Sequence, residues 1–233
     1  VAAAFPVGGV SIGPGELELT KSGSLSVVDA SGSDASATGF FSTSGAGRLT
    51  MRNNANLTVA GTVNLSGTTS ITGYNVTFDA ASDLSFGLSS IYRPTITNAT
   101  TYSTIGVDGT ATLRGSVRAD FSGVTPSAGD AWTLIDAAAI DGAFGSVSAA
   151  GLPQGTGLAG AVSVTPGGRG NLVQLTIEQR LVLLVDRQTG ATSIKNFGAS
   201  PISIEGYSIA SQLGLLDGSD AAWNSLQDQG EAN

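Results

Sequence analysis

The sequence predicts an all-β protein, a β-solenoid (β-helix) with a β-strand cap followed by a partial β-sandwich module. Three observations support this. Apolar residues alternate with polar ones in short runs, such as Leu57 and Val59 or Val63 and Leu65, which Asn, Gly, Ser or Asp separate. Only 12% of residues are charged, so Ser and Thr must provide most of the polar strand surface. Gly, with 33 of 233 residues, is roughly twice as frequent as usual. Short strands at this spacing favour solenoid coils of three strands each, and a β-sandwich is the alternative.

Residues 1–47 are predicted to form an N-terminal arm and the strands that lead into the solenoid. Glu16–Leu19 and Ser24–Val27 alternate with period two, which is typical of half-buried strands. The apolar residues of this segment suit an extended arm that pairs with a neighbouring molecule, or strands packed on their own domain. The candidate assembly-arm residues are Phe5, Val10, Ile12, Leu17 and Leu19.

Residues 48–118 are predicted to be the solenoid rungs. Apolar pairs such as Leu49 and Met51 recur roughly every six to eight residues and are expected to point inward. Asn53, Asn54 and Asn64 suit the corners, because Asn tolerates left-handed backbone and can stack in ladders.

Residues 119–178 are predicted to end the solenoid with longer strands, at 132–136, 144–147 and 172–177. Residues 179–233 predict a partial β-sandwich of three strands with one short helix, which Ser219 and Asp220 would cap. Three strands do not complete a sandwich. We therefore expect further chain or another subunit to provide the missing strands.

Composition and charge exclude several classes of function. The net charge is −8 and the few Lys and Arg residues are scattered, which argues against a nucleic-acid partner. Without His or Cys, the chain cannot form a Ser-His-Asp triad, a thiol nucleophile or a typical zinc site. No apolar run approaches the roughly 20 residues of a membrane helix. We expect no enzyme activity, no cofactor, no metal and no transmembrane segment.

Carboxylates are the remaining candidates for chemistry. Arg118 and Asp120 alternate on one predicted strand, and Asp79 and Asp83 precede Arg93 in the sequence. Charges two residues apart on an exposed strand usually form a solvated ladder. Residues 217–220 have calcium-binding residue types but lack the ligand spacing of an EF-hand loop. We interpret these groups as structural.

The aromatic residues are few. Trp132 and Trp223 lie in apolar surroundings and are predicted to pack in the core. Tyr74, Tyr92 and Tyr102 fall near predicted rung corners and are the candidate ligand-facing aromatics, which would stack against a carbohydrate.

The segments 110–117, 121–136 and 140–147 resemble the solenoid-terminating part of large secreted bacterial repeat proteins with autotransporter-like β-solenoids. The segments 183–196, 204–209 and 223–229 are similar to a β-sandwich module of planctomycete exoproteins that end in PEP-CTERM-type sorting signals. These motifs are structural, so the resemblance implies a secreted, extracellular, cell-surface location and an architecture, but no activity.

The sequence therefore predicts a non-catalytic extracellular structural protein. We expect it to be a subunit of a cell-surface filament, sheath or matrix that self-associates into a polymer, because unpaired strand edges are templates for association. The alternative is a cell-surface adhesin or polysaccharide-binding module.

Overall fold

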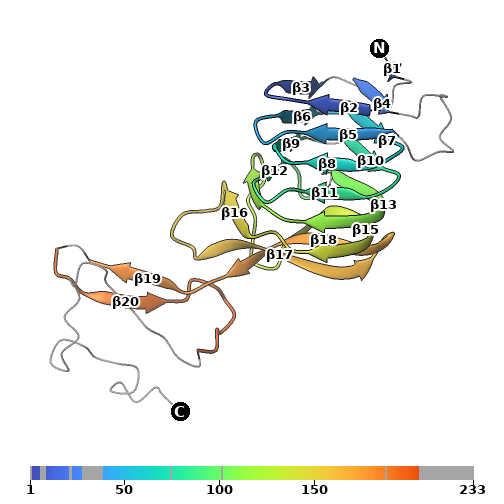
Figure 1. The fold of residues 1–233 in the computed structure, drawn as a ribbon. Helices are drawn as coiled ribbons and strands as arrows, with labels where there is room; N and C mark the ends of the chain where they lie inside the picture. The colour runs from blue at the N-terminus through green and yellow to red at the C-terminus, as the bar shows by residue number, and fades with distance from the viewer. Residues whose placement is uncertain are drawn as a thin grey trace. The chain divides into compact units, whose positions relative to one another are not determined.

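A computed structural model shows an all-β architecture, as predicted (Figure 1). It describes residues 2–5, 9–20, 23–27, 39–73, 75–100, 102–186 and 188–204. No helix of the described residues is long and apolar enough to cross a membrane. The chain divides into two compact units, Val1–Ala199 and Ser200–Asn233, and every described strand belongs to the first.

The strands from β1 to β16 form three columns of parallel pairs. The first column contains β1 (Ala2–Phe5), β4 (Ser24–Val27), β7 (Asn56–Val59), β10 (Thr77–Ala80), β13 (Thr104–Leu113) and β15 (Ala131–Gly142). The second contains β2 (Gly9–Ile12), β5 (Phe40–Thr43), β8 (Val63–Leu65) and β11 (Leu84–Phe86), and ends on the second half of β13. The third contains β3 (Glu16–Leu19), β6 (Arg48–Arg52), β9 (Thr68–Thr72), β12 (Ile91–Ile96), β14 (Ser116–Phe121) and β16 (Ser146–Ala150).

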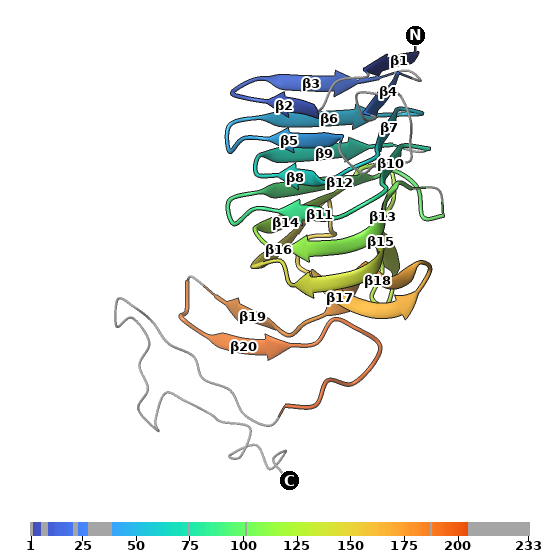
Figure 2. The same cartoon turned by 45° about the vertical axis from the view of Figure 1, so that its right-hand side comes forward.

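Up to β10, each strand pairs in parallel with the strand three positions further along the chain, so three consecutive strands form one layer of a stack (Figure 2). The first two columns belong to one sheet and the third is a six-stranded sheet of its own. From β13 onward, one long strand replaces the separate strands of the first two columns. The register between β13 and β15 shifts between Val107 and Thr110, where the corner would otherwise lie.

Alternating apolar residues fill the space between the columns. Leu25, Leu57, Phe78, Ile105 and Ile135 lie opposite one another in successive strands of the first column, and all five are buried. Such a row of inward side chains removes apolar surface from water, and each Å² of buried apolar surface stabilises the fold by about 25 cal/mol. The predicted alternation is therefore what forms the core.

One corner of the stack carries a short asparagine ladder. Asn54 and Asn75 have left-handed backbone, with φ of 60° and 54°, and stand at equivalent turns 21 positions apart. The Asn75 Nδ2 group donates a hydrogen bond to Asn54 Oδ1 at 3.3 Å. The predicted corner role of Asn54 is confirmed. That of Asn64 is wrong, because Asn64 lies within β8 with its side chain exposed.

Another corner brings the backbones of successive layers very close together. A Cβ atom added to Gly67 would lie 1.9 Å from the carbonyl oxygen of Gly47 in the preceding layer. The Thr68 N–H donates to that same oxygen at 3.1 Å. Only glycine fits at this position.

An antiparallel hairpin follows the parallel columns. It contains β17 (Leu158–Gly167) and β18 (Gly170–Gln179), and β18 pairs with β15. The predicted strands at 132–136, 144–147 and 172–177 correspond to β15, β16 and β18.

A second hairpin contains β19 (Val182–Val185) and β20 (Thr192–Lys195), which pair with each other. Its turn is held by the Asp186 carboxylate, which accepts hydrogen bonds from the Gln188 and Thr189 N–H groups. These bonds lower the pKa of Asp186. Of the predicted third sandwich strand, residues 202–204 are not in a strand. Its remainder and the predicted helix lie outside the described residues.

Candidate functional site

The outer face of the six-stranded sheet carries an unusual line of polar side chains. In the registers of these parallel pairs, Thr50 lies opposite Ser70, Ser70 opposite Arg93, and Arg118 opposite Ser148. Arg93 and Arg118 are also opposite each other. The pairs before them, Tyr92 with Val117, and after them, Thr95 with Asp120, share one register, and that register places Arg93 opposite Arg118. We call Thr50, Ser70, Arg93, Arg118 and Ser148 the central row.

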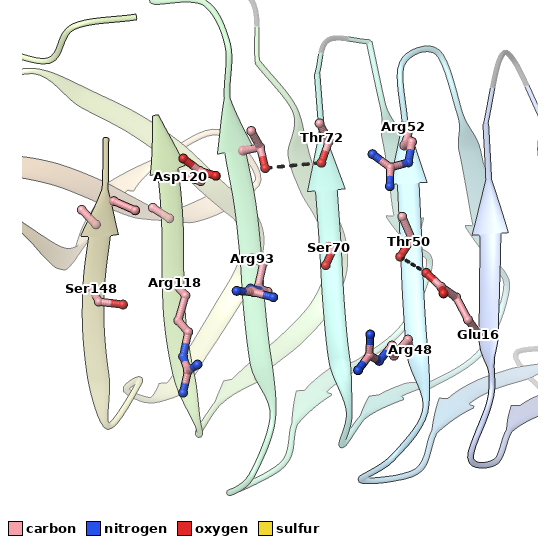
Figure 3. Close-up of a pocket in the computed structure, with 14 residues that line it drawn as sticks. Glu16, Arg48, Thr50, Arg52, Ser70, Thr72, Arg93, Arg118, Asp120 and Ser148 are labelled. Atoms are coloured by element: carbon pink, nitrogen blue, oxygen red, sulfur yellow. Dashed lines mark hydrogen bonds between the residues drawn. The ribbon is translucent and has the colours of Figure 1, made fainter. Parts of the chain in front are cut away.

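The central row runs across a depression of about 580 Å³ (Figure 3). Strands β3, β6, β9, β12, β14 and β16 all contribute to it. The lining residues are Glu16, Arg48, Thr50, Arg52, Ser70, Thr72, Arg93, Thr95, Arg118, Ala119, Asp120, Ser148, Ala149 and Ala150. Serine, threonine and arginine dominate, so the surface is rich in hydrogen-bond donors.

Carboxylates at one end of this face are engaged by neighbouring side chains. Arg52 Nε lies 2.8 Å from Glu18 Oε1, and the Thr50 hydroxyl donates to Glu16 Oε1 at 2.6 Å. Arg93 and Arg118 form no ion pair with any residue that the structure describes, and the same holds for Arg48 in this lining. Asp120 lies on the same face two residues from Arg118, but no ion pair joins it to either arginine. Within the described residues, no ion pair therefore neutralises the charge of Arg93 or Arg118.

Arg93 and Arg118 are neighbours in space. Adjacent strands are about 4.8 Å apart, and like charges placed directly opposite each other are destabilising. Both side chains are exposed and rise from the same face of the sheet (Figure 3). The nearest acid along β14 is Asp120, which lies opposite Thr95 rather than either arginine. An arginine pair of this kind can bind a carboxylate, sulfate or phosphate, whose oxygens match the guanidinium fork.

The structure corrects the prediction for Tyr92. Its side chain is completely buried at an inward position of β12, and its ring packs on Phe86 with centroids 5.7 Å apart. The hydroxyl lies 3.5 Å from the Leu134 carbonyl oxygen. Burial raises the pKa of Tyr92 well above its usual range. Tyr92 is a core residue and cannot face a ligand.

The other two candidate tyrosines give no aromatic platform. Tyr102 is half-buried against the core, and its hydroxyl accepts a hydrogen bond from the Thr133 N–H at 3.3 Å. Tyr74 lies outside the described residues. Trp132 is buried, as predicted, and packs on Phe121 with ring centroids 4.9 Å apart.

The predicted assembly arm is also corrected, because its segments are strands of the chain's own sheets. Phe5 lies opposite Val27 in the first column, and β2 and β3 pair with β5 and β6. The inward side chains of β2 and β3 pack against the end of the core; they are Val10, Ile12, Leu17 and Leu19. The alternative of strands packed on their own domain is the one observed.

The acidic residues of the other sheet hold the cap. The Arg169 guanidinium, from the β17–β18 turn, lies 3.0 Å from Asp79 and 2.6 Å from Asp108. Asp136 accepts the Arg169 backbone N–H at 2.7 Å. Asp83 accepts a hydrogen bond from the Thr110 N–H at 2.8 Å. Within the described ranges, no group of three or more acidic side chains could hold a metal ion.

The sequence predicted neither the pair of Arg93 and Arg118 nor the contact of Arg169 with Asp79 and Asp108. Each depends on strand register, which brings together residues far apart in the chain. Arg118 lies on a predicted strand, but no strand was predicted at Arg93, so the sequence pattern offered no register that would place the two side by side.

Comparisons with known proteins do not assign this site. No protein-family model, curated protein or solved structure matches the chain.

Proposed function

We propose that this chain is a non-catalytic, extracellular structural protein. In this proposal the parallel columns are the coils of a β-solenoid, the β17–β18 hairpin caps one end, and copies join through strand edges into a cell-surface filament, sheath or matrix. The absence of His and Cys from the sequence excludes a Ser-His-Asp triad, a thiol nucleophile and a typical zinc site, which supports a non-catalytic role.

The observation that carries the proposal is the exposed edge at the β1–β3 end. Among the described residues, β1, β2 and β3 each pair on one side only. Val10 and Leu17 are only partly buried, whereas Phe41 and Leu49, their partners in the next layer, are fully buried. Within the described part of the chain, both the backbone hydrogen-bonding groups and the apolar side chains of this edge are therefore without a further strand.

The other end of the stack differs. There β17 pairs only with β18 within the described part of the chain, and Val164 on β17 is 47% exposed. A contact between two different ends is heterologous, and it extends into a fibre when it does not close into a ring. This asymmetry supports head-to-tail growth.

The test compares two substitutions on the same strand. Val10→Lys puts a charge on the inward side of β2, whereas Ser11→Lys puts it on the outward, exposed side. We expect Val10→Lys to abolish assembly, because an inward charge blocks strand addition, and Ser11→Lys to leave it intact. Light scattering after size-exclusion chromatography and negative-stain electron microscopy would measure assembly. Circular dichroism would verify that both variants are folded.

Two results would contradict the proposal. The first is a wild-type chain that remains monomeric at high concentration. The second is equal assembly of the Val10→Lys and Ser11→Lys variants.

A further inference from the structure

We propose that Arg93 and Arg118 form an anion-binding site on the outer face of the six-stranded sheet, and that its ligand is an acidic polysaccharide carrying carboxylate or sulfate groups. This activity goes beyond the proposed structural role, because a passive scaffold needs no unneutralised arginine pair. It also does not depend on self-association.

The two arginines face each other although the chain carries an excess of acidic residues. The chain has 18 acidic and 10 basic residues, so carboxylates are plentiful. Even so, two arginines lie directly opposite each other with no ion pair among the described residues. Like charges in this arrangement repel, and a bound anion between them would turn that repulsion into attraction. The pair is therefore suited to an anion that the chain does not itself provide.

Serine and threonine hydroxyls lie around the arginine pair. Ser70 lies beside Arg93 in the central row, and Ser148 lies beside Arg118. Thr72 and Thr95 form the neighbouring row, where the Thr72 hydroxyl donates to that of Thr95 at 3.3 Å. Guanidinium groups bind acidic groups in a bidentate manner, and hydroxyls exchange hydrogen bonds with sugar hydroxyls. The depression thus presents donors for both parts of an acidic sugar.

The course of the depression across the sheet indicates the form of the ligand. The lining residues come from six adjacent strands, so the depression crosses the sheet and suits an extended chain rather than a compact molecule. Nucleic acid is disfavoured, because its binding needs many phosphate contacts and bases stack on aromatic side chains. None of the lining residues is aromatic, and the net charge is −8. A polysaccharide with spaced acidic groups fits better a lining whose arginines, Arg48, Arg52, Arg93 and Arg118, stand among serine and threonine hydroxyls.

The experiment measures binding of the whole chain to immobilised polymers at low ionic strength. The probes are polygalacturonate for carboxylate, dextran sulfate for sulfate, unmodified dextran as the neutral polymer, and oligodeoxythymidine for nucleic acid. We expect binding to one or both acidic polysaccharides, no binding to dextran, and weaker binding as salt is added. The two acidic probes distinguish between the two anionic groups.

The matched variants separate a local site from net charge. Arg93→Gln/Arg118→Gln removes the pair, whereas Arg180→Gln/Lys195→Gln removes two exposed cations that do not line the depression. We expect the first double variant to bind about 100-fold more weakly, tenfold for each arginine, since tenfold corresponds to 1.4 kcal/mol. The second should bind within about threefold of the wild-type chain.

Thermal unfolding serves as the folding control. Removing the repulsive pair should leave the melting temperature unchanged or slightly raised, so a loss of binding cannot be attributed to unfolding. The proposal is overturned if the wild-type chain binds neither acidic polysaccharide, or if both double variants lose binding equally. Tighter binding to oligodeoxythymidine than to either polysaccharide would also overturn it.

Discussion

The close approach of Gly67 to Gly47 in the preceding layer allows a test of the stacked architecture by the substitution Gly67→Ala. An alanine Cβ would lie 1.9 Å from the Gly47 carbonyl oxygen and 2.6 Å from that of Ser44. Ordinary contact begins near 3.4 Å, so the two layers must separate locally by about 1.5 Å. The hydrogen bond from the Thr68 N–H to Gly47, now 3.1 Å long, would then be broken.

The expected cost is the sum of two effects. Overpacking of this kind costs about 1 to 3 kcal/mol, and a lost hydrogen bond costs about 1 kcal/mol more. We therefore expect Gly67→Ala to lower the free energy of unfolding by about 3 kcal/mol. For a chain of this length, that corresponds to a fall in Tm of roughly 6 to 12 °C, measured by scanning calorimetry.

Gly45→Ala is the matched control, because Gly45 lies in the same corner of an adjacent layer. A Cβ atom there would meet nothing within 4 Å. The Tm of this variant should be unchanged or slightly higher. Alanine lowers the conformational entropy of the unfolded chain, which stabilises the fold by about 0.4 to 1 kcal/mol. Equal Tm values for the two variants would refute the close stacking of the layers at this corner.

Two further predictions concern the cap and the core. Arg169→Gln should lower the free energy of unfolding in urea by about 1 kcal/mol, because Arg169 pairs with both Asp79 and Asp108. The effect is no larger because the Arg169 side chain is 35% exposed and solvent screens its charge. Arg180→Gln breaks an exposed pair with Glu178 and should lower the free energy of unfolding by less. Equal effects would contradict a clamping role for Arg169. Tyr92→Phe should be nearly neutral at pH 7 and should reduce the loss of stability above pH 10. Because burial raises the pKa of Tyr92, the unfolded chain releases the tyrosine hydroxyl proton at a lower pH than the folded chain does. Above pH 10, the free energy of unfolding of the wild-type chain should therefore fall by about 1.4 kcal/mol per pH unit more than that of Tyr92→Phe. Parallel urea-unfolding profiles of the two chains from pH 8 to 11 would show that the tyrosine is not buried.

Local sequence pattern predicted the strands well because alternation reports directly on which side of a strand is buried. The runs around Leu57 and Val63 are β7 and β8, and the prediction for Asn54 followed from its tolerance of left-handed backbone. The fusion of two columns into β13 was not predictable in this way. It depends on whether a corner forms between Val107 and Thr110, and nothing in the local alternation decides that.

The candidate site was harder to predict, because it depends on which side of a strand a residue occupies. The sequence predicted Tyr92 near a rung corner, where its ring would face a ligand. Instead β12 continues through Pro94, and the ladder to β14 has paired residues up to Tyr92 and again from Thr95. Tyr92 therefore points inward, and Arg93 next to it points outward. The misplaced corner therefore explains the wrong prediction for Tyr92.

The two arginine arrangements support different conclusions for a physical reason. Arg169 lies between Asp79 and Asp108, which compensate its charge, and so it has a sufficient role in holding the cap. The pair of Arg93 and Arg118 has no such compensation among the described residues, and each increases the electrostatic cost of the other. Because the same chain neutralises an arginine on one sheet with nearby carboxylates, a shortage of acids does not explain the uncompensated pair on the other. An external anion does explain it, which is why the polysaccharide experiment is directed at this face rather than at the tyrosines.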